Sequence, residues 1–255
     1  MSTFNRQSFD LTGKVALITG GASGLGQNYA IALSLYGADI FVVSRQQTGW
    51  ETTRQKVEAN GRQIAFLQQD ITEEGCAPRI IQQVIDHFGH LDILVNNAGM
   101  QRRDDVLAFK DADWQRVIDV DLTGVVLTDK YVVQQMVKQQ SGSVINMSSI
   151  LGVVGAANSQ AYSAAKAGVA NFTRSQAVTY APQGIRFNAV APGYVNTPLL
   201  QTLPSDVTDS MVAKMPVGRL AEPSEIANVI AFLASDDASI VTGAVINADG
   251  GYTAQ

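Results

Sequence analysis

Short apolar segments alternate with longer segments of helical periodicity along almost the whole chain. The apolar segments are β-branched or continuously apolar, which is typical of strands buried on both faces of a sheet. Strands are predicted at residues 15–19, 40–44, 64–68, 93–96, 144–147, 186–190 and 245–247. Helices are predicted between them, at residues 25–36, 50–60, 73–88, 112–139, 161–180 and 224–234.

This alternation predicts an α/β fold, a doubly wound parallel sheet of seven strands with helices on both faces. No repeat, low-complexity tract or linker divides the chain, so residues 1–255 are predicted to form a single domain. The least regular segment, residues 192–216, has only a short helical pattern near residues 206–214. Long irregular segments in compact domains are usually functional, so this one is predicted to be a lid over the substrate.

The composition excludes several classes of protein. A chain of 255 residues that is 46% hydrophobic and 16% charged has ample material for a core. Its net charge of −5 argues against general binding to nucleic acid or to anionic membranes. Cys76 is the single cysteine, so no disulfide framework and no metal site are expected. We see no signal peptide and no membrane-spanning segment, and we expect a cytoplasmic protein.

A glycine-rich turn, residues 19–26, follows the first predicted strand and opens a helix. Glycine lets the backbone turn tightly and approach a ligand closely. Free N–H groups and the positive end of the helix dipole favour a phosphate there. This placement predicts a dinucleotide site. Its expected contacts in the turn are Gly20, Ser23, Gly24, Leu25 and Gly26.

The spacing of Gly20, Gly24 and Gly26 resembles the glycine motif of the short-chain dehydrogenase/reductase family, and further motifs of that family follow in order. They are Asn96-Asn97-Ala98-Gly99 after the fourth strand, Ser149, Tyr162 and Lys166 in a Y-x-x-x-K pattern, Pro192-Gly193 after the sixth strand, and Asp249-Gly250-Gly251 after the seventh. The resemblance covers nearly the whole chain. It implies a single-domain Rossmann fold and an oxidoreductase that moves a hydride between NAD(P) and a carbinol carbon.

Tyr162 and Lys166 are four residues apart on a predicted helix and share one face. A free tyrosine has a pKa of about 10 and is a poor base at neutral pH, and a nearby ammonium favours the phenolate. The resemblance makes Tyr162 the acid/base, Lys166 the group that tunes it and holds the nicotinamide ribose, and Ser149 a donor to the substrate oxygen. Ser148, next to Ser149, is the alternative.

One position departs from the family pattern. Relatives commonly carry an asparagine 28 residues before the catalytic serine, where it supports a water-mediated proton relay, and here the residue is Asp121. A carboxylate is able to replace the asparagine if the backbone carbonyl does the work, but it lacks the amide donor. A negative charge near Lys166 also weakens the effect of that lysine on Tyr162.

The sequence favours NADP(H) over NAD(H). An acidic residue after the second strand binds the ribose of NAD, whereas a basic residue accepts the 2′-phosphate of NADP. The second strand ends at Ser44 and Arg45 follows, although Arg45 facing only solvent is the alternative. The resemblance places Asp70 at the adenine and Thr197 at the carboxamide. The other cofactor contacts expected are Ile71, Asn97, Ala98, Gly99, Pro192, Gly193 and Val195.

Arg102 and Arg103 follow the Asn-Asn-Ala-Gly motif, where they are able to bind a substrate carboxylate, although a solvated charged loop is the alternative. Residues 19–29, 50–61 and 96–103 resemble the gluconate 5-dehydrogenases and the 2-deoxygluconate or 2-keto-3-deoxygluconate dehydrogenases, which predicts a sugar acid as substrate. The alternatives are a 3-ketoacyl-carrier-protein reductase and a general carbonyl or diketone reductase. Gln140 and Gln183 occupy the places where the carrier-protein reductases have docking arginines.

Two further expectations concern assembly and class. The predicted helices at residues 112–139 and 161–180 are apolar on more than one face, and the family usually forms tetramers through them, so we expect a homotetramer. A dinucleotide-sensing regulator of the same fold is the non-enzyme alternative. Such proteins typically lack the tyrosine or the lysine, whereas this chain keeps Ser149, Tyr162 and Lys166.

Overall fold

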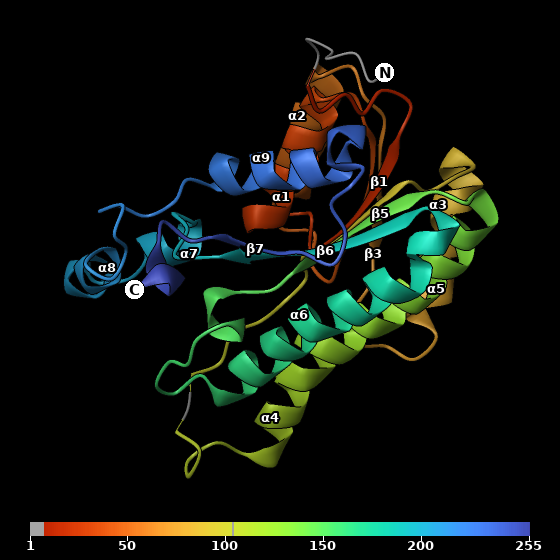
Figure 1. Cartoon of the computed structure of the whole chain (residues 1–255). Coiled ribbons are helices and arrows are strands. Elements are labelled where there is room, and N and C mark those ends of the chain that lie inside the picture. The colour runs from red at the N-terminus through yellow and green to blue at the C-terminus, as the bar shows by residue number, and fades with distance from the viewer. Residues whose placement is uncertain (1–7, 104) are drawn as a thin grey trace.

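The computed structural model describes residues 8–103 and 105–255, and within them all named strands form one parallel sheet. The strand order is β3-β2-β1-β4-β5-β6-β7, which confirms the predicted fold (Figure 1). The strands are β1 Val15–Thr19, β2 Asp39–Ser44, β3 Ile64–Gln68, β4 Ile93–Asn96, β5 Gly142–Met147, β6 Ile185–Pro192 and β7 Val245–Ala248. Because the chain runs from β1 to β3 on one side and from β4 to β7 on the other, loops diverge beside β1 and β4.

Helices cover both faces of the sheet (Figure 1). One face carries α1 Gly24–Leu35, α2 Trp50–Ala59 and α9 Pro223–Ala234. The other carries α3 Cys76–Phe88, α5 Gly124–Gln139 and α6 Gln160–Tyr180, with α4 Asp111–Ile118 extending beyond the sheet. The short helices α7 Pro198–Gln201 and α8 Ser205–Val212 lie past the carboxyl end of β6. Each face has its own apolar core, one around Tyr29 and Ile230 and the other around Met136 and Phe187.

The prediction of one helix over residues 112–139 is wrong at one point. A π-helical turn, Asp119–Thr123, separates α4 from α5, and the Gly124 N–H bonds to the Asp119 carbonyl. A single widened turn leaves the apolar periodicity on either side intact, so the sequence does not reveal it. The helix predicted from residue 73 begins instead at Cys76, after Gly75 in the left-handed region with φ of 69°.

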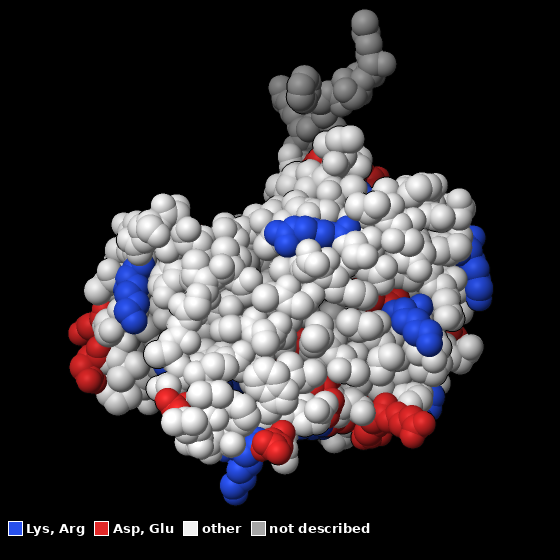
Figure 2. All heavy atoms as spheres, turned by 60° about the horizontal axis from the view of Figure 1, so that its bottom comes forward, with Lys and Arg blue, Asp and Glu red and all other residues white. Residues whose placement is uncertain are grey.

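Charged side chains are dispersed over the face shown in Figure 2, where basic and acidic groups alternate with neutral surface. No helix in the described part of the chain is long and apolar enough to cross a membrane. Residues 8–103 and 105–255 also contain no group of three or more His, Cys, Asp or Glu side chains able to hold a metal ion.

A buried polar cluster ties the sheet to the helices α5 and α6. Asp129 is fully buried on α5 and accepts hydrogen bonds from Asn96 Nδ2 at 2.6 Å and Asn146 Nδ2 at 3.1 Å. Asn146 Nδ2 also donates to Thr173 Oγ1 on α6 at 3.1 Å. The donors of these bonds to Asp129 are neutral amides, and their bonds lower the pKa of the carboxyl group. Burial outweighs them and raises the pKa of Asp129 to about 7.

The raised pKa predicts a pH-dependent stability. The folded protein keeps a proton on Asp129 that the unfolded chain loses near pH 4, so this site destabilises the fold progressively from about pH 4 to pH 7. We therefore expect Asp129→Asn to gain stability relative to the parent over that interval, by up to about 4 kcal/mol at 1.4 kcal/mol per pKa unit. Urea unfolding at several pH values measures the difference. The control is Asp119→Asn, and an Asp129→Asn difference that is constant with pH contradicts the prediction.

Candidate functional site

A cleft of about 1100 Å³ opens at the carboxyl ends of the strands, beside the divergence between β1 and β4. Most of the predicted site residues line it: Gly20, Ser23, Gly24, Leu25, Ser44, Arg45, Asp70, Ile71, Asn97, Ala98, Gly99, Arg103, Asp121, Ser149, Tyr162, Lys166, Pro192, Gly193, Val195 and Thr197. Gly26 and Arg102 are the predicted site residues that do not line it.

The turn after β1 has the shape and polarity of an anion site. Gly20 and Gly24 have φ of 67° and 59°, and a Cβ at Gly24 would meet no atom within 4 Å. Ser23 is the N-cap of α1 but makes no capping bond with its side chain, and the first turn has no acidic residue. The N–H groups at this helix end are therefore left for a ligand, and the phosphates of a dinucleotide fit them.

Gly26 acts from behind this turn. A Cβ at Gly26 would overlap the Gly20 carbonyl oxygen and lie 2.5 Å from Asn97 Nδ2. The Asn97 amide donates to the carbonyls of Thr19 and Gly20 at 3.1 and 3.3 Å. Thr19 Oγ1 in turn accepts the N–H groups of Asn97 and Ala98. The loop after β4 is thus fastened to the glycine turn in space that a side chain at Gly26 would fill.

The two adjacent serines after β5 have different surroundings. Ser148 Oγ donates to the Lys166 carbonyl at 3.0 Å, so its hydroxyl holds the loop against α6. Ser149 Oγ accepts the Leu151 N–H at 3.1 Å and donates no bond within residues 8–103 and 105–255. The hydroxyl hydrogen of Ser149 is therefore left for a substrate oxygen, which favours Ser149 over Ser148.

Lys166 and Tyr162 lie together on α6 as their spacing predicts. Lys166 is only 3% exposed, and its Nζ donates to the Met147 carbonyl at 3.0 Å. The same Nζ lies 5.5 Å from the centre of the Tyr162 ring. The ammonium is thus fixed by β5 beside the phenol ring.

Asp121, on the π-helical turn, completes this group. Its Oδ1 lies 3.0 Å from Lys166 Nζ, and its Oδ2 accepts the Met100 N–H at 3.0 Å. The carboxylate is fully buried, and burial raises the pKa of Asp121 while Lys166 and the Met100 N–H oppose this rise. The structure therefore places a carboxylate directly against the lysine.

The far end of the cleft carries the predicted adenine and ribose contacts. Arg45 is exposed at the end of β2, with Ser44 and Gln46 beside it on the cleft wall. Asp70 is held by Thr72 and by Arg116, whose Nη2 donates to Asp70 Oδ2 at 2.8 Å. Burial alone would raise the pKa of Asp70, but these partners lower it to about 2. Arg116 lines the cleft too, and no motif in the sequence identifies it.

The loop of residues 196–220 closes the other end. Its base is a bridge in which the Ala221 N–H donates to the Tyr194 carbonyl and the Asn196 N–H to the Ala221 carbonyl. The Val217 N–H donates to the Gly250 carbonyl, which fastens this loop to the C-terminal turn. Apolar side chains of the loop line the cleft together with the segment after β5, namely Leu200, Leu203, Val207, Met211, Ile150 and Leu151. The sequence predicted an irregular lid segment at residues 192–216, which overlaps this loop, but it did not predict these contacts.

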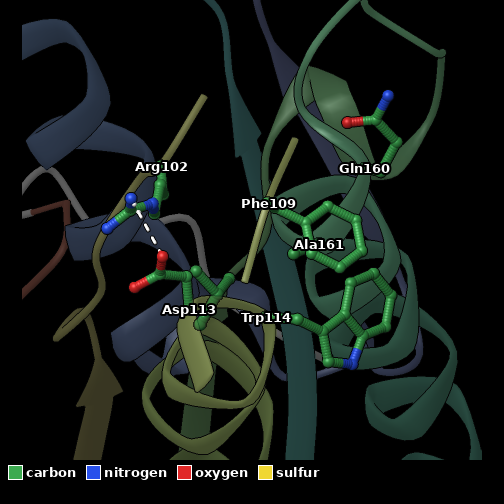
Figure 3. Close-up of a pocket in the computed structure, with 7 residues that line it drawn as sticks. Arg102, Phe109, Asp113, Trp114, Gln160 and Ala161 are labelled. Carbon is green, nitrogen blue, oxygen red and sulfur yellow. Dashed lines mark ion pairs between the residues drawn. The ribbon is translucent and has the colours of Figure 1, made fainter. Parts of the chain in front are cut away.

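The paired arginines diverge. Figure 3 shows Arg102 pointing to Asp113 on α4, with Phe109 and Trp114 beside them, and the ion pair measures 2.9 Å. This small hollow is separate from the residues that line the main cleft, so Arg102 is not placed to meet a ligand there. Arg103 does line the cleft. Burial and Tyr252 raise the pKa of Tyr194, and the charge of Arg103 opposes them, so Arg103 acts on the same wall as Tyr194.

Comparisons with known proteins agree with this geometry. Residues 20–253 match a family model described as enoyl-(acyl carrier protein) reductase. A cis-4-hydroxycyclohexanecarboxylate dehydrogenase from Sinomonas cyclohexanicum is 49% identical over 94% of this chain and 97% of its own. A 3-oxoacyl-[acyl-carrier-protein] reductase from Thermotoga maritima is 37% identical over 94% and 98%. The structure of a putative 2-deoxy-D-gluconate 3-dehydrogenase from Agrobacterium tumefaciens with bound NADP superposes with a TM-score of 0.88, at 34% identity, covering 97% and 99%.

Gly26→Ala tests the anion site without any substrate. The added Cβ would displace either the Gly20 carbonyl or the Asn97 amide, so we expect dinucleotide affinity to fall at least tenfold. Quenching of protein fluorescence by NADPH and NADH measures the affinity. The control is Gly155→Ala, because a Cβ at Gly155 would meet no atom within 4 Å. Equal dinucleotide affinity in both variants and the parent contradicts this account of the turn.

Proposed function

This chain belongs to the short-chain dehydrogenase/reductase family and is an NAD(P)-dependent oxidoreductase of alcohols and ketones, and we propose that it acts on a compact ring alcohol bearing a carboxylate. The observation that carries the substrate proposal is the wall of the cleft that also contains Ser149 and Tyr162. Leu200, Leu203, Val207 and Met211 make that wall apolar, and Arg103 adds a positive charge to it.

The proposed reaction assigns one task to each residue. Ser149 donates a hydrogen bond to the substrate oxygen, and Tyr162 exchanges a proton with that oxygen. Lys166, fixed by the Met147 carbonyl, stabilises the charge on the Tyr162 oxygen. The nicotinamide, when bound, supplies or accepts the hydride at the carbon. Residues Gly20 to Gly26 hold the phosphates of the cofactor, and Pro192, Gly193, Val195 and Thr197 line the place expected for its nicotinamide.

The substrate proposal modifies the sugar-acid expectation. A polyhydroxylated acid needs several hydrogen-bond partners, because each buried hydroxyl without a partner costs free energy. The loop 196–220 presents mainly aliphatic side chains to the cleft, which suits a hydrocarbon ring. The relative from Sinomonas cyclohexanicum is named for a ring of this kind with a hydroxyl and a carboxylate. The sugar acid and the acyl-carrier substrate are competing outcomes of the test below.

Two further parts of the proposal concern the loop and the cofactor. The loop 196–220 serves as a lid over the substrate, since its base is fixed while its apolar side chains face the cleft. NADP(H) is favoured over NAD(H), because Arg45 is exposed on the cleft wall where a 2′-phosphate would lie and no acidic residue stands at the end of β2.

Arg45→Ala tests the cofactor preference. A charge-assisted hydrogen bond contributes about 1.5–3 kcal/mol, so we expect the KM for NADPH to rise by about tenfold or more while the KM for NADH stays unchanged. Initial rates with each cofactor measure the change. The matched control is Arg54→Ala, since Arg54 pairs with Glu51 and Glu58 on the surface of α2. An equal change for both cofactors contradicts a role for Arg45 at the 2′-phosphate.

A substrate panel tests the main proposal. We expect cis-4-hydroxycyclohexanecarboxylate to be oxidised with a higher kcat/KM than gluconate, 2-deoxygluconate or cyclohexanol, and Tyr162→Phe to abolish turnover. Arg103→Ala should raise the KM for the ring acid by about tenfold without changing that for cyclohexanol, because only the acid loses a charged partner.

Arg102→Ala is the matched control for this panel, since Asp113 holds the Arg102 side chain at 2.9 Å. Preference for gluconate would restore the sugar-acid expectation. Preference for a β-ketoacyl thioester would favour the acyl-carrier alternative. Equal loss of ring-acid activity in the Arg102 and Arg103 variants would contradict the assignment of the carboxylate to Arg103.

A further inference from the structure

The pair of Lys166 and Asp121 is an ion pair enclosed by protein. The exposed fraction is 3% for Lys166 and 0% for Asp121, and their charged atoms are 3.0 Å apart. Gly99 borders the pair, and a Cβ there would lie 2.7 Å from Asp121 Oδ1. The loop after β4 therefore leaves room for the carboxylate only because residue 99 has no side chain. Because both side chains are buried, their charges are weakly screened and each acts strongly on its neighbours.

The charged neighbours of the lysine are few. Burial lowers the pKa of Lys166, but Tyr162 and Asp121 outweigh it and raise the pKa above its ordinary value. Lys166 Nζ donates to the Met147 carbonyl at the end of β5. Asp121 Oδ2 accepts the Met100 N–H from the loop after β4. Arg103 and the Asp70–Arg116 pair lie elsewhere on the cleft wall. The ammonium thus acts on Tyr162 while a carboxylate on its other side offsets its charge.

We propose that Asp121 offsets the charge of Lys166, so that the lysine favours the Tyr162 phenolate less strongly than it would beside a neutral residue, and the site is set for carbonyl reduction. In that direction the Tyr162 O–H bond breaks and its proton goes to the substrate oxygen, while the reduced nicotinamide, when bound, would supply the hydride to the carbon. The phenolate left behind regains a proton from solvent. Oxidation is the reverse and requires the phenolate at the start, which Asp121 disfavours. This inference rests on the proposed acid/base role of Tyr162.

Asp121→Asn tests the charge with little change of shape. With the carboxylate gone, Lys166 favours the phenolate more strongly, so the acidic limb of kcat/KM for alcohol oxidation should move down by about one pH unit. The basic limb for carbonyl reduction should move down by a similar amount. The control is Asp119→Asn, because Asp119 lies on the same turn but accepts a bond from Gln115 at 2.8 Å. Asp121→Ser serves as the second variant if the asparagine disturbs folding.

A spectroscopic titration tests the same charge effect without substrate or cofactor. The phenolate absorbance of the protein minus that of its Tyr162→Phe variant reports Tyr162 alone. We expect it to appear about one pH unit lower in the Asp121 variants than in the parent. An unchanged or higher titration overturns the inference even if the enzyme is active. A shifted titration in a protein that turns over no alcohol or ketone would support it while contradicting the proposed function.

Discussion

The buried ammonium of Lys166 is the constraint around which the site is arranged. A charge with 3% exposure needs partners, because an isolated ion inside a protein is very costly. Its partners come from three places, the Met147 carbonyl at the end of β5, the Tyr162 ring one turn back on α6, and Asp121 on the π-helical turn. Satisfying one lysine therefore fixes a strand end, a helix and a widened turn relative to one another.

Side-chain hydrogen bonds beneath the cleft connect the surroundings of Lys166 to the glycine turn. Thr19 and Asn97 join the turn after β1 to the loop after β4, and one residue earlier Asn96 reaches down to Asp129. Asn146, just before Met147, joins the same cluster. The carboxyl ends of β1, β4 and β5 are thus held by these side-chain hydrogen bonds as well as by the bonds of the sheet. Mutations that remove these side-chain bonds would alter the cleft without touching any ligand.

The sequence predicts most of this structure, because the strands are continuous apolar segments and the motifs mark their carboxyl ends. Tyr162 and Lys166 were placed correctly by helical spacing, and parallel strands necessarily bring their carboxyl ends to one edge. The π-helical turn was missed, since the helical segments on either side keep their own period and the one-residue shift between them is a weak signal in the sequence. Arg102 and Arg103 are identical and adjacent in the sequence, and only the position of Asp113 separates their roles. Arg116 was missed because its partner Asp70 is 46 residues away.

Some residues of the site belong to the family motifs and serve the proposed hydride transfer itself. Others, such as Asp121 and Arg103, lie outside those motifs and are proposed to adjust the reaction. Hydride transfer needs the glycine turn, a hydroxyl donor and a proton-exchanging phenol, and these follow the family pattern. In our proposals Asp121 adjusts the charge beside the phenol, whereas Arg103 and the aliphatic side chains of the loop 196–220, which line the cleft, set the polarity around the substrate. The loop is fastened at its base and, through Val217, to the C-terminal turn, so its residues between these points are able to change without disturbing the sheet. Relatives named for different substrates are 49% and 37% identical to this chain, so whole-chain similarity alone does not assign the substrate.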